Sequence, residues 1–304
     1  MKIKKNLFIC LTPYQLFLVP KIIKLEKLED TTILLINLSH SPKNFYYLNQ
    51  ASQECDCNTI VFTQIHKSKY LKILSYLKFI TKSVMLHKFK NLYIASLHDK
   101  YIHTLMRFIF FQNLNTFDDG IANINKGGIF FTDTYIKKKI LNKICTHYSV
   151  FPNVTNIIDS QKIRQLDITT SLGHLSSNNN KRLISIFIGQ PYEEFIPNFQ
   201  KNILEKFLQQ NSVNYYFQHP RETEFIESVQ YIESEKIFES FLEDFIFENP
   251  NYEINLYSFV STVMFNVSNY PNVKCYALKN NYLYKNYSYL YDLMSQFNIQ
   301  WIDI

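Results

Sequence analysis

The chain has 304 residues, of which 46% are hydrophobic and 19% are charged, and its formal net charge is +6. This composition is typical of a folded globular protein and excludes a disordered chain, and the length suits two domains better than one core. The sequence contains 22 Tyr and 26 Phe beside 5 Gly, an excess that we attribute to AT-rich codon usage rather than to an aromatic ligand-binding surface.

The first half of the chain alternates short apolar segments with amphipathic ones. Strands are predicted at residues 6–11, 31–37, 59–63, 91–95 and 113–118, and helices at residues 14–28, 43–53, 67–88, 100–111 and near 135–145. Short strands that alternate with helices are typical of a parallel, doubly wound sheet. The first half therefore predicts a Rossmann-type α/β domain.

A polar stretch without periodicity, between Thr169 and Asn180, interrupts this alternation. After it, strands are predicted at residues 182–189, 213–217, 252–256 and 273–277, helices at 196–209, 238–247 and from 261, and a short strand or turn at 225–229. The predicted organisation is an N-terminal acceptor-side domain (1–165), a linker (166–180) and a C-terminal nucleotide-binding domain (181–304). We expect two Rossmann-type parallel-sheet domains that face a cleft.

The segment 67–90 is basic and amphipathic. It contains no acidic residue and seven lysines, namely Lys67, Lys69, Lys72, Lys78, Lys82, Lys88 and Lys90. Apolar residues are interleaved with them: Leu71, Ile73, Leu74, Leu77, Phe79 and Ile80. A helix of this kind either lies on an anionic membrane surface or presents an ordinary solvated face, and both interpretations stay open.

The expected location is the cytoplasm, with peripheral contact at the inner membrane as the alternative that segment 67–90 leaves open. The sequence lacks the roughly 18 consecutive apolar residues of a transmembrane helix, and residues 1–20 lack the order of a signal peptide. The scattered cysteines are expected to be reduced: Cys10, Cys55, Cys57, Cys145 and Cys275. Their spacing does not predict a zinc site, and the sequence shows no feature that points to a nucleic acid partner.

Two short motifs follow predicted strands. His219-Pro220-Arg221-Glu222 comes after the strand 213–217, and Asp118-Asp119-Gly120 ends the strand 113–118. Ligands of open α/β sheets bind outside the carboxyl ends of the strands. Histidine exchanges a proton near neutral pH, and as a cation it holds a phosphate. The motifs suggest a general base in one domain and a phosphate-facing histidine in the other, although either motif alone is more often an ordinary loop.

Five segments resemble bacterial glycosyltransferase family 52, which contains the lipooligosaccharide α-2,3-sialyltransferases. They are NLYIASL (91–97), TFDDGIANI (116–124), IFIGQP (186–191), FQHPRE (217–222) and YPNVKCYALK (270–279). Their common order makes the resemblance far more specific than any one segment. It implies a GT-B-like α/β fold and inverting, metal-independent transfer of sialic acid from CMP-sialic acid to a galactose-terminated lipooligosaccharide, with no further cofactor.

The resemblance also assigns roles to residues of the second half. Donor binding is implied for Gly189, Gln190, Phe217, Gln218, His219, Pro220, Arg221, Phe238, Glu239, Ser261 and Thr262. Among these, His219 is implied to contact and protonate the departing phosphate. Arg221 either adds positive charge there or forms a surface salt bridge. Ser261 and Thr262 match the segment that binds the nucleotide phosphate, and Phe238 and Glu239 match the one that grips the nucleoside.

The general base has two candidates. The resemblance places it just after the Gly-x-Pro of the segment IFIGQP (186–191), where this chain has Tyr192 followed by Glu193. Other bacterial GT-B sialyltransferases use an acidic-acidic-glycine turn, which corresponds here to Asp119. We favour Asp119 because it lies in the opposite domain from His219, and Glu193 is the second candidate. The non-functional alternative for Asp118 is a turn residue hydrogen-bonded to its own backbone.

Two alternatives to a sialyltransferase stay open at this level. One is a related transferase that uses another nucleotide sugar, such as a glucosyl donor. The other is a non-catalytic lipid-surface module in which the basic segment 67–90 provides the function. The sequence is compatible with a homodimer and does not determine the oligomeric state.

Overall fold

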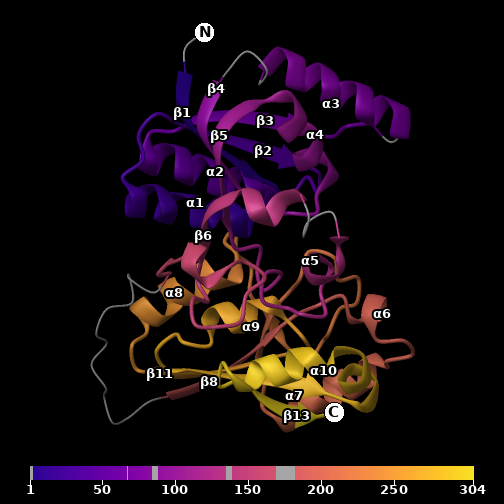
Figure 1. Ribbon diagram of the computed structural model, residues 1–304. Coiled ribbons are helices and arrows are strands. Elements are labelled where there is room, and N and C mark those ends of the chain that lie inside the picture. Colours follow the sequence, from indigo (N-terminus) through magenta and orange to yellow (C-terminus); the bar gives the residue numbers. More distant parts are fainter. Residues whose placement is uncertain (1–2, 67, 84–87, 135–138, 169–181) are drawn as a thin grey trace. The chain divides into compact units, whose positions relative to one another are not determined.

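The computed structural model describes residues 3–66, 68–83, 88–134, 139–168 and 182–304. The chain divides into two compact units, Met1–Ile168 and Thr169–Ile304 (Figure 1). Most of the predicted linker, from residue 169 to residue 180, lies outside the described residues.

The first unit contains a seven-stranded sheet with the order β3-β2-β1-β4-β5-β6-β7. Its strands are β1 (Ile3–Cys10), β2 (Thr31–Asn37), β3 (Asn58–Thr63), β4 (Lys88–Ile94), β5 (Phe110–Phe117), β6 (Ile144–Ser149) and β7 (Ile163–Gln165). All of the pairs are parallel. The helices that connect them are α1 (Pro13–Glu26), α2 (Pro42–Cys55), α3 (Lys69–Ser83), α4 (Lys100–Phe108) and α5 (Ile129–Thr132).

Helices cover both faces of this sheet because its central strands are apolar on both sides. Leu7 and Ile9 of β1 belong to a core cluster that includes Ile80 of α3 and Leu105 of α4. The alternate residue Phe8 points to the other face, where it stacks on Tyr93 at 4.2 Å between ring centroids. Helices α1 and α2 pack against each other on that second face (Figure 1). The predicted doubly wound arrangement is confirmed.

A row of asparagines fixes the register of the three central strands. Asn91 of β4 pairs in register with Asn6 of β1 and with Asn113 of β5. The Asn91 Nδ2 donates to Asn6 Oδ1 at 2.9 Å, and the Asn113 Nδ2 donates to Asn91 Oδ1 at 2.9 Å. Since a slip of one residue would break both bonds and turn every side chain to the opposite face, the row selects one alignment.

The second unit contains a six-stranded parallel sheet with the order β10-β9-β8-β11-β12-β13. Its strands are β8 (Arg182–Ile188), β9 (Tyr215–Phe217), β10 (Gln230–Tyr231), β11 (Tyr252–Ser258), β12 (Val273–Lys279) and β13 (Gln300–Asp303). The helices are α6 (Tyr192–Phe195), α7 (Lys201–Gln210), α8 (Phe238–Glu248), α9 (Thr262–Val267) and α10 (Asn281–Ser295). Two parallel-sheet Rossmann-type units are thus present, as the sequence predicts.

The structure differs locally from the sequence predictions. The expected helix near 135–145 is wrong at its end, because Ile144 begins strand β6; residues 135–138 lie outside the described part. The isoleucines of this segment have a helical spacing, which favours the prediction of a helix. Strand β6 lacks the apolar pattern of a buried strand because two of its buried residues, His147 and Ser149, are polar. The segment 225–229 contains a turn, which is one of the two alternatives predicted for it, and α10 and β13 are not among the predicted elements.

We predict that Asn91→Ala lowers the free energy of unfolding by about 1–3 kcal/mol, because it leaves a donor on Asn113 and an acceptor on Asn6 unpaired. Urea denaturation measures the change. Asn58→Ala, at the exposed start of β3, is the matched control and should cost less than about 0.5 kcal/mol. Equal losses in the two variants would contradict a specific role for the asparagine row.

Candidate active site

In both units, polar residues gather at the carboxyl ends of the central strands. In the first unit, Ser96 follows β4 and Asp119 follows β5. In the second unit, Gly189 follows β8, His219 follows β9 and Ser261 follows β11. In each sheet the chain moves outward in both directions from a central strand, and the loops at such a switch point form the usual ligand site of this architecture.

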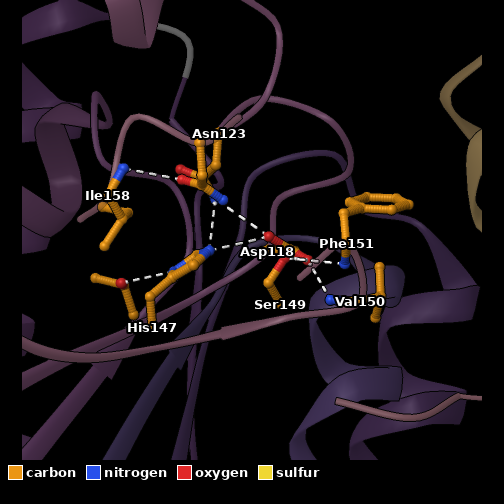
Figure 2. A network of polar contacts seen from close by, with 9 residues as sticks. Asp118, Asn123, His147, Ser149, Val150, Phe151 and Ile158 are labelled. Carbon is orange, nitrogen blue, oxygen red and sulfur yellow. Dashed lines mark hydrogen bonds and ion pairs between the residues drawn. The ribbon is translucent and has the colours of Figure 1, made fainter. Parts of the chain in front are cut away.

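Asp118 is the centre of a buried network (Figure 2). Its Oδ2 accepts from the backbone N–H of Val150 at 2.7 Å and from Ser149 Oγ at 3.0 Å. Its Oδ1 lies 3.1 Å from His147 Nε2 and accepts from Asn123 Nδ2 at 3.4 Å. Both Asp118 and His147 are fully buried. Asp118 therefore joins β5 to the end of β6, and it holds the turn through β6 rather than through its own backbone.

Asp119 differs from its neighbour in being partly exposed. Its Oδ1 accepts from Gln15 Nε2 at 2.8 Å, and its Oδ2 accepts from Ser96 Oγ at 2.7 Å. Gln15 is itself fixed, since its Oε1 accepts from the backbone N–H of Leu11 at 2.7 Å. Gly120 follows at φ 56°, a left-handed conformation that glycine adopts without strain. The carboxylate is thus oriented by two side-chain donors.

The second site centres on Glu222, the last residue of the His219 motif, for which the sequence predicts no role of its own. Its Oε1 accepts from Tyr216 Oη at 2.5 Å, and its Oε2 accepts from the backbone N–H of His219 at 2.6 Å. A Cβ atom on Gly189 would lie 2.1 Å from Glu222 Oε2 and 2.7 Å from Tyr216 Cε1. The glycine after β8 is therefore required by the carboxylate that closes the His219 turn.

The environment of Glu222 changes its protonation. Burial raises the pKa of Glu222 to about 7, although the hydrogen bonds from Tyr216 and His219 favour the charged form. Burial and the nearby Glu222 carboxylate also raise the pKa of Tyr216 far above its usual value. Glu222 consequently gains or loses its proton near neutral pH, in direct contact with the backbone of His219.

His219 is held in a closed turn. Its carbonyl accepts from Glu222 N at 3.0 Å, and its Nδ1 accepts from the backbone N–H of Arg221 at 3.1 Å. An accepting Nδ1 places the proton of the neutral ring on Nε2, which makes Nε2 the hydrogen-bond donor of the ring. The Arg221 guanidinium pairs instead with Glu194 Oε2 at 2.8 Å, and both side chains are exposed. This corresponds to the salt-bridge alternative for Arg221.

The other predicted donor-site residues lie around the carboxyl edge of the second sheet. Ser261 is buried and occupies the N-cap position of α9, and Thr262 is exposed in its first turn. Glu239 of α8 is buried and its Oε1 accepts from Asn266 Nδ2 of α9 at 2.7 Å, so it ties these two helices together. Gln190 Nε2 donates to the carbonyl of Val260 at 3.2 Å, which joins the loops after β8 and β11.

The remaining predicted residues divide into buried and exposed ones. Phe217 and Phe238 are buried and form an edge-to-face pair with 5.1 Å between ring centroids. Gln218 and Pro220 are exposed on the His219 turn. Glu193 is exposed in the short helix α6, in the second unit. Over the described ranges, no three His, Cys, Asp or Glu side chains are grouped as ligands of a metal ion.

We predict that Glu222→Gln flattens the pH dependence of stability. Because the folded pKa of about 7 lies above the ordinary 4.5, this group stabilises the fold at low pH and loses that contribution as pH rises through 7. The wild type should lose roughly 3 kcal/mol between about pH 4.5 and 8 through this group. Urea denaturation across this range tests it. Glu224→Gln, exposed on the same turn, should follow the wild type, and an unchanged slope in Glu222→Gln would refute the assignment.

Comparison with solved structures supports the two-unit architecture. The chain aligns over 98% of its length, and 90% of the other chain, with a Listeria monocytogenes protein described as a UDP-N-acetylglucosamine 2-epimerase, at a TM-score of 0.52 and 13% identity. It also aligns over 99% of its length, and 85% of the other chain, with Arabidopsis thaliana UGT89C1 complexed with UDP, at a TM-score of 0.52 and 8% identity. At these identities the similarity concerns the fold alone, and the predicted GT-B-like fold class is confirmed.

Sequence comparison places the chain more narrowly. It is 30% identical to an N-acetyllactosaminide alpha-2,3-sialyltransferase of Haemophilus influenzae, covering 88% of this chain and 90% of the relative. It is 28% identical to a CMP-N-acetylneuraminate:beta-galactoside alpha-2,3-sialyltransferase of Pasteurella multocida, covering 98% and 99%. The model of glycosyltransferase family 52 matches residues 29–138 and 128–282, which include all five segments of the predicted resemblance. The chain is therefore an enzyme of the glycosyltransferase class and belongs to glycosyltransferase family 52.

Proposed function

We propose that this enzyme transfers sialic acid from CMP-sialic acid to a galactose-terminated lipooligosaccharide, with inversion at the anomeric carbon and without a metal ion. The observation that carries the proposal is the similarity, along most of the chain, to relatives that are named α-2,3-sialyltransferases. The name of the Pasteurella multocida relative specifies a CMP-N-acetylneuraminate donor and a β-galactoside acceptor. This similarity favours a cytidine monophosphate sugar over the alternative of a glucosyl donor.

Asp119 is the proposed general base. Single displacement at the sialic acid requires a group that removes the proton of the acceptor hydroxyl as the new bond forms. The Asp119 carboxylate is fixed at both oxygens by Gln15 and Ser96 and is partly exposed. Asp118, by contrast, is fully buried with donors at both oxygens. The geometry within the first unit therefore supports Asp119 over Asp118, and Glu193 stays the second candidate.

His219 is the proposed group that receives the departing phosphate. A phosphate leaving group needs a donor or a positive charge at the oxygen that departs. The bond from Arg221 N to Nδ1 orients the ring with its proton on Nε2. The hydrogen bond from the His219 backbone N–H to Glu222 Oε2 fixes the backbone of the residue that carries this ring. In this proposal Ser261 and Thr262 add hydroxyls for the same phosphate, and Glu239 positions α9 through Asn266 beside the nucleoside.

We predict that His219→Ala reduces transfer by about two to three decades, because the leaving phosphate loses a contact worth roughly 2–4 kcal/mol in the barrier. Initial rates with CMP-sialic acid and a β-galactoside measure the effect, and circular dichroism checks the fold. Arg221→Ala serves as the control on the same turn, since its guanidinium pairs with Glu194, and it should retain most of the activity. A His219→Ala enzyme with more than about a third of wild-type turnover would exclude this role.

We predict that Asp119→Asn lowers transfer by about 10²–10⁴-fold while donor binding and stability are retained. Glu193→Gln should then stay active. Asp118→Asn is the contrasting variant, because it weakens the buried carboxylate that accepts hydrogen bonds from the Val150 N–H and the Ser149 hydroxyl. We expect it to lower the free energy of unfolding by about 2 kcal/mol or more. If Glu193→Gln loses transfer and Asp119→Asn does not, Glu193 is the base. If both variants stay active, the base is another residue.

The function as a whole is tested by a donor screen. Purified enzyme is assayed for turnover of CMP-sialic acid, UDP-glucose and UDP-galactose, each with and without a chelator. We expect turnover of the cytidine donor alone, within about twofold in the presence of chelator, since a twofold change corresponds to a barrier change below about 0.5 kcal/mol. Turnover of a uridine donor would overturn the proposed donor, and activity that requires added magnesium or manganese would overturn metal independence.

A further inference from the structure

Helix α3 combines a buried face with an apolar exposed face. Tyr76 and Ile80 are buried and belong to the core cluster of the first sheet. Four large apolar side chains are nevertheless exposed in its first two turns: Tyr70 (88%), Leu71 (47%), Ile73 (54%) and Leu74 (63%). Ile65, shortly before the helix, is exposed at 74%. Single exposed apolar residues are common, whereas a group of this kind on one helix marks an interaction surface.

Lysines continue this exposed surface along the helix. Lys78 and Lys82 follow Tyr70 and Leu74 at intervals of four residues, so these four side chains lie along one side of α3. The sequence contains no acidic residue between Asp56 and Asp99. Within the described residues, neither Lys78 nor Lys82 forms an ion pair.

Some surface lysines outside α3 are paired with a carboxylate. Examples are Lys5 with Glu29, Lys24 with Glu54 and Lys274 with Glu253. Lys78 and Lys82 of α3, by contrast, have no carboxylate partner in the part of the chain that the structure describes. A partner surface that binds both the exposed apolar side chains and the lysines of α3 has to offer an apolar layer beside negative charge. An anionic lipid leaflet has this structure.

The dimensions of α3 exclude a transmembrane arrangement. The helix has 15 residues, whereas a bilayer core requires about 20. Throughout the described ranges, no helix is long and apolar enough to cross a membrane. One face of α3 is already buried against the sheet, so only a position parallel to the lipid surface leaves the core intact.

We propose that α3 docks this protein onto an anionic lipid bilayer. Tyr70, Leu71 and Leu74 enter the boundary between headgroups and acyl chains, and Lys78 and Lys82 lie at the lipid phosphates. The lipid partner is independent of the transfer chemistry. If the proposed function also holds, the docked helix keeps the enzyme at the surface that carries a lipid-linked acceptor.

Flotation with vesicles tests the proposal on the full-length protein without any sugar donor. We expect binding to vesicles of mixed phosphatidylcholine and phosphatidylglycerol, and little binding to phosphatidylcholine alone. The double variant Lys78→Ala with Lys82→Ala should reduce partitioning roughly 30-fold, since each lysine near the surface contributes about a factor of five. The double variant Leu71→Ser with Leu74→Ser should reduce it at least about tenfold.

Matched controls come from the second unit. Lys206→Ala with Lys285→Ala removes two exposed lysines, and Ile203→Ser with Phe247→Ser removes two exposed apolar side chains. Both controls should bind vesicles like the wild type. Wild-type protein that does not float with anionic vesicles, or α3 variants that float normally, would refute the proposal. It would also be refuted if the leucine variant changed the mass of the protein in light scattering but not its vesicle binding, because α3 would then be a protein interface.

The outcome is separable from that of the proposed function. Donor turnover measured on the same samples with a water-soluble acceptor should be normal in both α3 variants, since neither changes a residue of the candidate active site. Loss of turnover with every donor but intact vesicle binding would refute the transfer reaction alone. Normal turnover without vesicle binding would refute membrane docking alone.

Discussion

Because the strand pairs in both sheets are parallel, each strand has to be followed by a connection that returns the chain to the opposite edge. The connecting helices cover both faces of each sheet, and the central strands are therefore apolar on both faces. It also brings loops from distant parts of the sequence to one edge. Gln15, Ser96 and Asp119 meet in this way in the first unit, and Gly189, His219 and Glu222 meet in the second. The proposed transfer chemistry depends on this convergence.

Neighbouring carboxylates acquire different properties from their surroundings. Asp118 is saturated by donors from β6 and has no access to solvent, so it stabilises the turn. Asp119, one residue later, is oriented by Gln15 and Ser96 and keeps access to solvent. Glu222 illustrates a third case, in which burial beside Gly189 raises the pKa of the carboxyl to about 7 while its oxygens organise the His219 turn. Position in the network, more than residue type, determines what each acid does.

The sequence predicted those features that are encoded locally. Apolar runs such as 31–37 correspond closely to the strands, and the polar motifs after β5 and β9 lie at the carboxyl ends where they were expected. Strand β6 was missed because its buried residues include His147 and Ser149, which are polar in order to bind Asp118. Helix α10 and strand β13 were missed because their mixed tyrosine and polar residues lack a clear period.

Features that depend on contacts between distant segments were not predictable in this way. The role of Glu222 requires the absence of a side chain at Gly189, and the orientation of Asp119 requires residues from α1 and the end of β4. In the proposed function, the second unit binds the donor with its phosphate at His219. A crystal structure of the protein with cytidine monophosphate tests it most directly. We predict a phosphate oxygen within hydrogen-bonding distance of His219 Nε2 and the cytidine beside the start of α8, whereas a nucleotide bound at the Asp119 edge of the first sheet would contradict this donor site.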